Sequence, residues 1–223
     1  MIVGKEMIIN TNLVDQIYMI LKGKIINNEM NMGKKVNLKE VADDFNVSQT
    51  PVREVLNRLV RDGLVVNIPN KGYFVVEIKT QDLIDVLDVR KMIESYSIKY
   101  AINNVDPSKF RKMLNYIKIL KKEPENLEKG KIFYYSDIRF HILIVKGSCN
   151  KKLIEIYSEI YNIINMMILR MNYEKSAYEE FIDDHINLIR YILDKNYIYA
   201  KKLLSIHIDK SKDYYLDMLK NNK

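Results

Sequence analysis

Apolar side chains in the first part of the chain recur at spacings of three and four, which predicts amphipathic helices at residues 11–26 and 38–45. A third helix is predicted to follow, with Ser48 at its N-cap and Pro51 in its first turn. β-Branched residues then predict two short strands around a turn at residues 69–72. The order of helix, helix, tight turn, helix and hairpin is that of a winged helix-turn-helix unit.

The pattern changes beyond residues 78–81, where helical spacing continues without any further strand signal. We therefore place a domain boundary there, between residues 1–78 and residues 79–223. Short links between the later helices indicate an antiparallel bundle, so the expected fold class is mainly α, a winged helix-turn-helix joined to a bundle of about six helices. The first of these six helices is predicted to end near residue 103, and the second to begin at Pro107. The third is predicted to span about 132–146 and the fourth about 151–173. The fifth is predicted to begin at Ser176 and the sixth after Asn196.

The composition is that of a globular chain, because 223 residues with 48% hydrophobic side chains can form sizeable cores. No run of roughly 18 or more apolar residues is present, so we expect no membrane span. The first residues lack the apolar stretch of a secretory signal, and the single cysteine, Cys149, cannot form an internal disulfide. These features predict a cytoplasmic protein.

The net charge of +7 does not by itself establish a nucleic-acid partner. Residues 1–80 hold 11 Lys and Arg against 9 Asp and Glu, a net charge of +2, which leaves +5 for the rest of the chain. A DNA-binding role must therefore rest on where the charges lie. In a helix-turn-helix the N-terminal end of the recognition helix enters the major groove, so the residues there in position to contact DNA are Ser48, Gln49, Thr50 and Arg53. Lys39, at the start of the preceding helix, can reach a backbone phosphate, and Lys71, at the hairpin tip, can approach a minor groove.

These residues also have a simpler interpretation. Ser48 suits the capping position of any helix, and Arg53, Arg58 and Arg61 can form a solvated helix face. Trihelical units of this kind also serve as plain interaction modules. The pattern alone therefore leaves a DNA-binding role and a protein-interaction role both open.

The stretch VNLKEVADDFNVSQTPVREVLNRLVRDGLVVNIPNKGYFV resembles the DNA-binding domain of GntR-type bacterial transcription regulators. The hallmark of that family is a Val-Ser-x-Thr-Pro-Val-Arg-Glu-x-Leu run ahead of a Gly-Leu pair and a wing, and matches fall on Val47, Ser48, Thr50, Pro51, Val52, Arg53, Glu54, Leu56, Gly63, Leu64 and Gly72. The resemblance implies DNA contacts at Lys39, Ser48, Thr50, Arg53, Lys71 and Gly72. Gln49 departs from the family, which usually has arginine at this position. Because glutamine prefers an adenine edge and arginine a guanine edge, the operator sequence is expected to differ from that of close relatives.

The three histidines all lie in the second domain, at positions that predict a shared site. His141 follows Asp137 by one helical turn, and His185 and His207 are in phase with apolar neighbours on their own helices. All four side chains are expected to point into the bundle, where an unpaired polar group costs about 1–3 kcal/mol. A divalent Zn, Ni, Fe, Co or Mn ion would satisfy all four. The alternative is that each histidine is hydrogen-bonded within the core.

The second domain resembles the FCD domain, the effector module of the FadR branch of GntR regulators. The metal-binding pattern of that family, an Asp, a His four residues on and two later helix-borne histidines, falls on Asp137, His141, His185 and His207. Its Arg-x-x-x-Glu motif in the first helix matches Arg90 and Glu94, and its Gly-Asn pair is half kept at Cys149 and Asn150. The resemblance implies a metal site that holds a small carboxylate.

Three residues are candidates for binding the carboxylate effector: Arg90, Asn150 and Arg170. The planar guanidinium of Arg90 matches two carboxylate oxygens. The alternative for Arg90 is a solvent-facing ion pair with Glu94 on the next helical turn. Arg170 is expected to point inward from the fourth helix of the bundle.

The expected function is that of a homodimeric transcriptional repressor that binds a near-palindromic, double-stranded operator and responds to a small organic acid. One alternative keeps the DNA-binding role but makes the metal itself the signal, or purely structural. Another is a metal-dependent enzyme, which we disfavour because the neighbouring carboxylates Glu179 and Asp184 are expected to face outward. We therefore expect a regulator and not an enzyme.

Overall fold

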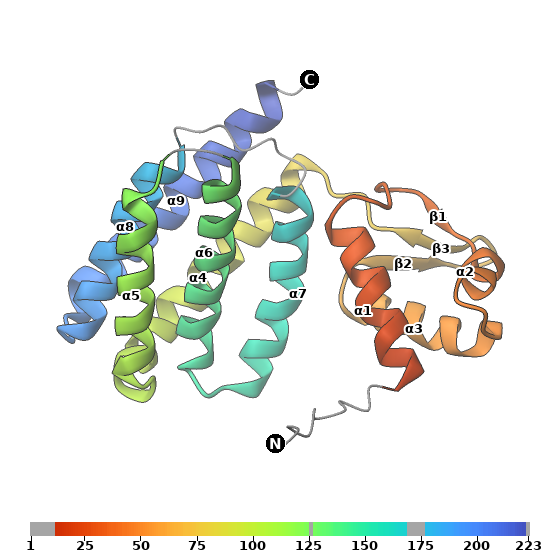
Figure 1. Cartoon of the computed structure of the whole chain (residues 1–223), viewed down its shortest axis with the longest axis horizontal. Helices are drawn as coiled ribbons and strands as arrows, with labels where there is room; N and C mark the ends of the chain where they lie inside the picture. Colours follow the sequence, from red (N-terminus) through yellow and green to blue (C-terminus); the bar gives the residue numbers. More distant parts are fainter. Residues whose placement is uncertain (1–11, 125–126, 169–176, 222–223) are drawn as a thin grey trace, which may run out of the picture. The chain divides into compact units, whose positions relative to one another are not determined.

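The computed structural model describes residues 12–124, 127–168 and 177–221. The chain forms two compact units, Met1–Ile78 and Lys79–Lys223, each of which has its own core. Helices α1 to α3 and a small sheet make up the first unit, and helices α4 to α9 make up the second (Figure 1). The predicted fold class, mainly α with a winged helix-turn-helix and a helical second part, is confirmed.

The N-terminal unit is built on α1 (Leu13–Ile26), α2 (Leu38–Asp44) and α3 (Gln49–Arg61). Asn12 and Asn37 cap α1 and α2, each accepting a hydrogen bond from the backbone N–H two residues further on. Helix α3 packs against α1 and α2, and it buries one apolar face that consists of Val52, Val55, Leu56 and Leu59. The opposite face of α3 is left at the surface.

A three-stranded antiparallel sheet completes this unit, in the order β1-β3-β2. Its strands are β1 (Lys35–Val36), β2 (Val65–Ile68) and β3 (Gly72–Val75). The sequence predicted β2 and β3 but missed β1, because a strand of two residues is too short to show alternation. Val36 of β1 pairs with Tyr73 of β3, so β1 extends the predicted hairpin at its β3 edge.

The C-terminal unit holds six helices within the described residues: α4 (Thr80–Asn104), α5 (Pro107–Lys122), α6 (Leu127–Lys146), α7 (Lys151–Ile168), α8 (Ala177–Leu193) and α9 (Tyr197–Asn221). Asp106 caps α5, and Pro107 occupies its first turn at the predicted start of this helix. Helix α6 begins earlier than its predicted start near Ile132, whereas the predicted helix end at Tyr173 and the predicted cap at Ser176 lie outside the described residues. None of the helices in the described part of the chain combines the length and the apolar character that crossing a bilayer requires.

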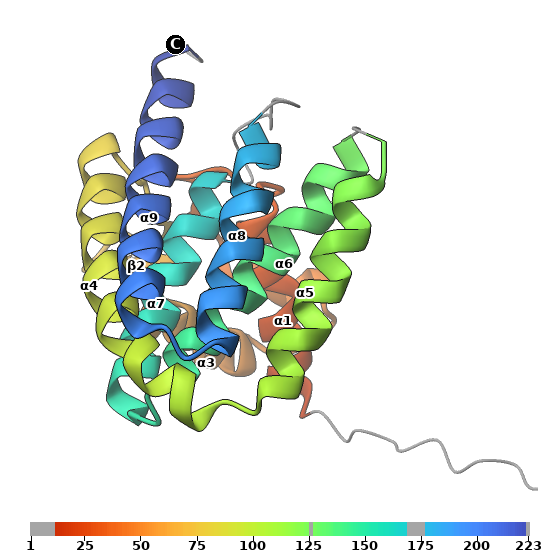
Figure 2. The same cartoon turned by 90° about the vertical axis from the view of Figure 1, so that its left-hand side faces the viewer.

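The helices of this unit pack in two layers (Figure 2). Helices α4, α9, α8 and α5 lie side by side in that order, and α6 and α7 lie behind them. Helix α4 contacts α9 in its own layer and α6 and α7 in the other layer. Side chains that project between the layers from α4, α6, α7, α8 and α9 can therefore meet in the interior.

Gly147, directly after α6, lies close against the C-terminal end of α4. A methyl group on Gly147 would lie 2.5 Å from the Cα atom of Ala101 and 2.9 Å from a methyl carbon of Val105. Real Cβ atoms do not come so close to a backbone atom, so only glycine fits without a shift of one helix. This contact fixes the spacing between the helix that carries Glu94 and the helix that carries His141.

Candidate metal centre and DNA-binding surface

The exposed face of α3 carries the side chains that were predicted to contact DNA. Gln49, Thr50 and Arg53 are exposed within its first turn and a half. Ser48 occupies the predicted N-cap position and is exposed, but its side chain makes no capping hydrogen bond. Its hydroxyl therefore remains available for an external acceptor such as a phosphate oxygen.

A side-chain hydrogen bond connects the predicted wing, strands β2 and β3, to α3. The hydroxyl of Tyr73 on β3 donates to Oδ1 of Asn57 on α3 over 2.7 Å. Lys71 in the β2–β3 turn is exposed, and Gly72 adopts a φ of 97°, a conformation that residues with a Cβ rarely take. Lys39 on α2 is also exposed.

Arg58 on α3 does not belong to the solvated face on which the simpler interpretation placed it. Its Nη1 donates to Oδ1 of Asp15 on α1 over 2.6 Å, and its guanidinium lies 3.7 Å from the ring centroid of Tyr18. The hydroxyl of Tyr18 donates in turn to Asp62, directly after α3. Arg58 therefore holds α1 against α3, whereas Arg53 projects into solvent.

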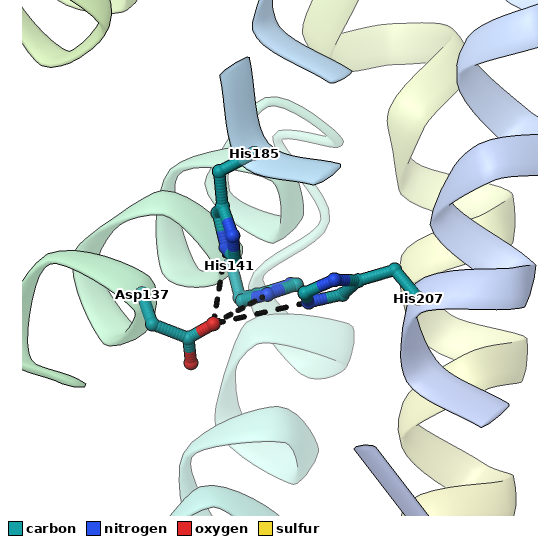
Figure 3. A group of neighbouring side chains, drawn as sticks. All are labelled: Asp137, His141, His185 and His207. Atoms are coloured by element: carbon teal, nitrogen blue, oxygen red, sulfur yellow. Dashed lines mark ion pairs between the residues drawn. The ribbon is translucent and has the colours of Figure 1, made fainter. Parts of the chain in front are cut away.

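In the C-terminal unit, Asp137, His141, His185 and His207 come together from three helices (Figure 3). Asp137 and His141 lie on α6, His185 on α8 and His207 on α9. Oδ1 of Asp137 is 3.3, 3.0 and 3.8 Å from the Nε2 atoms of His141, His185 and His207, respectively. One potential ligand atom from each residue lies within 4.8 Å of all the others. The structure therefore brings the four predicted residues to one point.

Each imidazole turns Nε2 toward this point and offers Nδ1 to an acceptor behind it. His141 Nδ1 lies 2.5 Å from Oε2 of Glu94, and His185 Nδ1 lies 2.7 Å from the backbone oxygen of Phe181. His207 Nδ1 lies 3.5 Å from Oδ2 of Asp184, which is longer than an ordinary hydrogen bond. Acceptors behind metal-binding histidines usually fix the ring orientation in this way.

The charges in the cluster favour a cation. Burial by itself would raise the pKa of Asp137, but the neighbouring His141 and His185 hold it well below its ordinary value. Burial and Arg90 act to lower the pKa of His141, yet Glu94 and Asp137 outweigh them and raise it. Burial, reinforced by the nearby His185, lowers the pKa of His207 to about 3. His207 is therefore neutral at physiological pH, and the cluster carries an ionised carboxylate.

The four residues fit a divalent metal ion. The Nε2 atoms of all three histidines are buried and have no hydrogen-bond partner among the described residues, a costly arrangement for polar atoms. Two ligand atoms that are each about 2.0–2.2 Å from the same metal ion lie roughly 3–4 Å from each other. The distances from Asp137 Oδ1 to the histidine Nε2 atoms are close to this value. Three neutral nitrogens and one carboxylate oxygen suit Zn, Ni, Fe, Co or Mn ions.

Arg90 and Glu94 form a buried ion pair on α4, so the alternative prediction of a solvent-facing pair is wrong. Arg90 Nε donates to Oε1 of Glu94 over 2.7 Å, and both residues are almost fully buried. The hydroxyl of Tyr157 on α7 donates to the same oxygen over 2.6 Å. Sequence reasoning gave no role at the site to Glu94 or Tyr157. The burial of Glu94 could have been predicted, because its carboxylate is in helical phase with the apolar residues Leu87 and Ile98.

Asp184 also differs from its predicted position. It was expected to face outward, but it is buried, and its Oδ2 lies 3.5 Å from His207 Nδ1 and 3.4 Å from Nζ of Lys210. Burial acts to raise its pKa, but His207 and Lys210 outweigh it and lower the pKa. The side chain of Glu179 lies outside those that the structure describes. Asp184 therefore lies behind the ring of a candidate ligand, beyond ordinary hydrogen-bond distance.

Asn150, another effector candidate, is not one of the residues that form this cluster. Asn150 is exposed, and its Oδ1 accepts a hydrogen bond from the backbone N–H of Leu153 in the first turn of α7. This position gives Asn150 a capping role. Arg170 lies outside the described residues.

Two family models match the chain. The model described as bacterial regulatory proteins, gntR family, matches residues 13–75, and the FCD domain model matches residues 85–210. The first match contains α1 to β3, and the second contains Arg90, Glu94 and all four residues of the cluster.

Known proteins similar to the chain include regulators from several bacteria. The HTH-type transcriptional regulator YdhC of Bacillus subtilis is 22% identical over 209 residues, which cover 93% of each chain. The gluconate operon transcriptional repressor of the same species is 23% identical over 203 residues, which cover 89% of this chain and 83% of the repressor. Among solved structures, E. coli McbR/YncC has a TM-score of 0.76 at 17% identity and covers 94% of this chain and 99% of its own.

Proposed function

The chain belongs to the GntR family of bacterial regulatory proteins and carries an FCD domain, and we propose that this transcriptional regulator is a repressor controlled by a small organic acid at a divalent metal site. The acid would bind in the C-terminal unit and change the affinity of the N-terminal unit for operator DNA. Since its target is the bacterial chromosome, we place its action in the cytoplasm.

The exposed face of α3 supports the DNA-binding half of the proposal. Gln49 and Arg53 suit two-point pairing with base edges, and Ser48 and Thr50 suit phosphate oxygens at a helix N-terminus. Lys71 and Gly72 belong to a wing that Tyr73 anchors to α3. Two such units in a homodimer would bind a near-palindromic operator.

One observation carries the metal half of the proposal: three buried Nε2 atoms without other partners surround one carboxylate oxygen. Asp137, His141, His185 and His207 would hold the ion. When bound, such an ion supplies positive charge and coordination positions that a carboxylate can occupy.

The charge of the site supports an acid as the effector. When the three imidazoles are neutral, the two carboxylates of Asp137 and Glu94 and the guanidinium of Arg90 together carry one net negative charge. A bound divalent ion changes this to one net positive charge. A monocarboxylate neutralises that charge, and neutral sites are the least costly to bury. Two of the similar proteins are named as repressors of gluconate operons, and gluconate is a small organic acid.

DNA binding by the purified full-length chain tests the proposal. An operator is first selected from random double-stranded DNA, and its dissociation constant is then measured at fixed salt with metal-loaded protein, with and without a panel of small acids. We expect one acid to weaken binding by at least about fivefold. If metal alone produced the full change in DNA affinity, the metal itself would be the signal. Absence of sequence-specific DNA binding under every condition would contradict the proposal.

A further inference from the structure

Glu94 is fully buried, and both of its carboxylate oxygens are engaged. Oε1 accepts hydrogen bonds from Arg90 Nε and from the hydroxyl of Tyr157, and Oε2 lies 2.5 Å from His141 Nδ1. Three helices, α4, α6 and α7, thus meet on one carboxylate. Either donor suffices to keep Oε1 on the side away from His141, so Oε2 is directed at His141.

The three imidazoles of the cluster are supported by different acceptors. His185 uses the backbone oxygen of Phe181 on its own helix, which no side-chain substitution removes. His207 has only a distant carboxylate, Asp184, at 3.5 Å. His141 alone has a fully buried carboxylate at close hydrogen-bond distance.

We propose that Glu94 is a positioning residue that holds His141 in the tautomer with the proton on Nδ1 and the lone pair of Nε2 directed at the metal. The inference rests on the proposed metal site. A carboxylate only accepts hydrogen bonds, so the nitrogen that faces it must carry the proton. The other nitrogen then has a lone pair, which is what a metal ligand needs.

A glutamine at this position should reverse the tautomer. Arg90 and Tyr157 are both donors at the Oε1 position, so the amide oxygen of glutamine would turn toward them. The amide NH2 would then face His141 Nδ1 and require it to accept. The proton of His141 would move to Nε2, where it blocks metal coordination. Glu94→Gln therefore changes the ligand while keeping the size of the side chain.

A competing explanation is that Glu94 serves only to neutralise the buried Arg90. Arg90→Met is the matched control, because it breaks the same ion pair but keeps Tyr157 as a donor to Oε1 and leaves the Glu94–His141 hydrogen bond in place. If Glu94 acts only through Arg90, the two substitutions should have the same effect on metal affinity. If Glu94 positions His141, only Glu94→Gln should weaken metal binding.

The experiment measures zinc affinity of the full-length chain by competition with a chromophoric chelator, in wild type, Glu94→Gln and Arg90→Met. We expect Glu94→Gln to weaken zinc binding by about 10- to 100-fold, and Arg90→Met to stay within about threefold of wild type. Equal weakening in both variants, or none in a folded Glu94→Gln protein, would overturn the inference. If wild type does not bind zinc, the same comparison is made with nickel, iron, cobalt and manganese, and a wild-type protein that binds none of these ions would instead contradict the proposed function.

A second measurement does not depend on the stability of the variant. The chain has only three histidines, so long-range 1H–15N spectra of histidine-labelled protein resolve three imidazoles. At mildly alkaline pH we expect metal-free wild type to show His141 with its proton on Nδ1, because no bound metal ion then dictates the tautomer. A His141 ring protonated on Nε2 in the wild-type protein would overturn the inference even if Glu94→Gln failed to fold.

Discussion

Nε2 of His185 lies 3.0 Å from Oδ1 of Asp137, although the two residues come from different helices, α8 and α6. A bound ion would tie these helices to α9 through His207. The two layers of the C-terminal unit would then be joined at their centre. Metal binding should therefore be visible in the stability of this unit as well as in its ligand chemistry.

Zinc should raise the thermal unfolding temperature of the metal-free full-length protein, and a chelator should reverse the change. Zinc at a free concentration about 100 times its dissociation constant stabilises a folded protein by about 2.7 kcal/mol. Calorimetry with and without zinc measures this effect. His185→Ala should abolish the response, whereas Asn150→Ala should preserve it because Asn150 is exposed and only caps α7. A zinc response that survives in His185→Ala would contradict the assigned ligand set.

Arg53→Ala should weaken binding to the selected operator by about 10- to 100-fold without lowering the free energy of unfolding, because Arg53 is exposed and in position to contact a base. Fluorescence anisotropy at fixed salt measures the affinity. The matched control is Arg58→Ala on the same helix, which removes contacts to Asp15 and Tyr18. We expect it to lower stability by at most about 1 kcal/mol and to leave sequence preference intact. Loss of sequence preference in Arg58→Ala alone would reverse this assignment.

Gln49→Arg should change the base preference at one operator position in each half-site from adenine to guanine. Gln49 is exposed in the first turn of α3, where the side chain can reach a base edge. Selection from random DNA with wild type and variant, compared position by position, measures the change. Identical selected sequences would show that Gln49 does not contact a base.

Gly147→Ala should destabilise the C-terminal unit by about 1–3 kcal/mol, because the new methyl group would overlap Ala101 on α4. Gly23→Ala in α1 is the control with the opposite sign. An added methyl there meets nothing within 4 Å, and alanine is about 0.5–1 kcal/mol more favourable than glycine in a helix. Chemical unfolding of both variants compares the two. No loss of stability in Gly147→Ala would show that α4 and α6 can separate freely.

Local patterns were enough to predict most of the elements. Ser48 in a capping position and Pro51 in a first turn predicted the start of α3, and Pro107 predicted the start of α5. The strand β1 escaped because it exists only through its pairing with β3, a long-range contact that leaves no periodic signal in two residues.

The inward positions of Asp137 and the three histidines followed from helical phase, since each is in phase with apolar neighbours. Phase does not reveal which side chain stands behind another, so the support of His141 by Glu94 and Tyr157 required the packing of α4, α6 and α7. Asp184 was misplaced for a related reason. A charged residue beside a histidine was expected at the surface, but His207 and Lys210 from α9 make its burial tolerable.

The metal content of the purified full-length protein is the most direct test of the central claim. After incubation in turn with zinc, nickel, iron, cobalt and manganese salts and removal of excess metal, elemental analysis should find about one divalent ion per chain for at least one of these metals. Asp137→Ala should retain less than about one tenth of that amount. A folded wild-type protein that carries no divalent ion, or an Asp137→Ala protein that carries as much as wild type, would contradict the account.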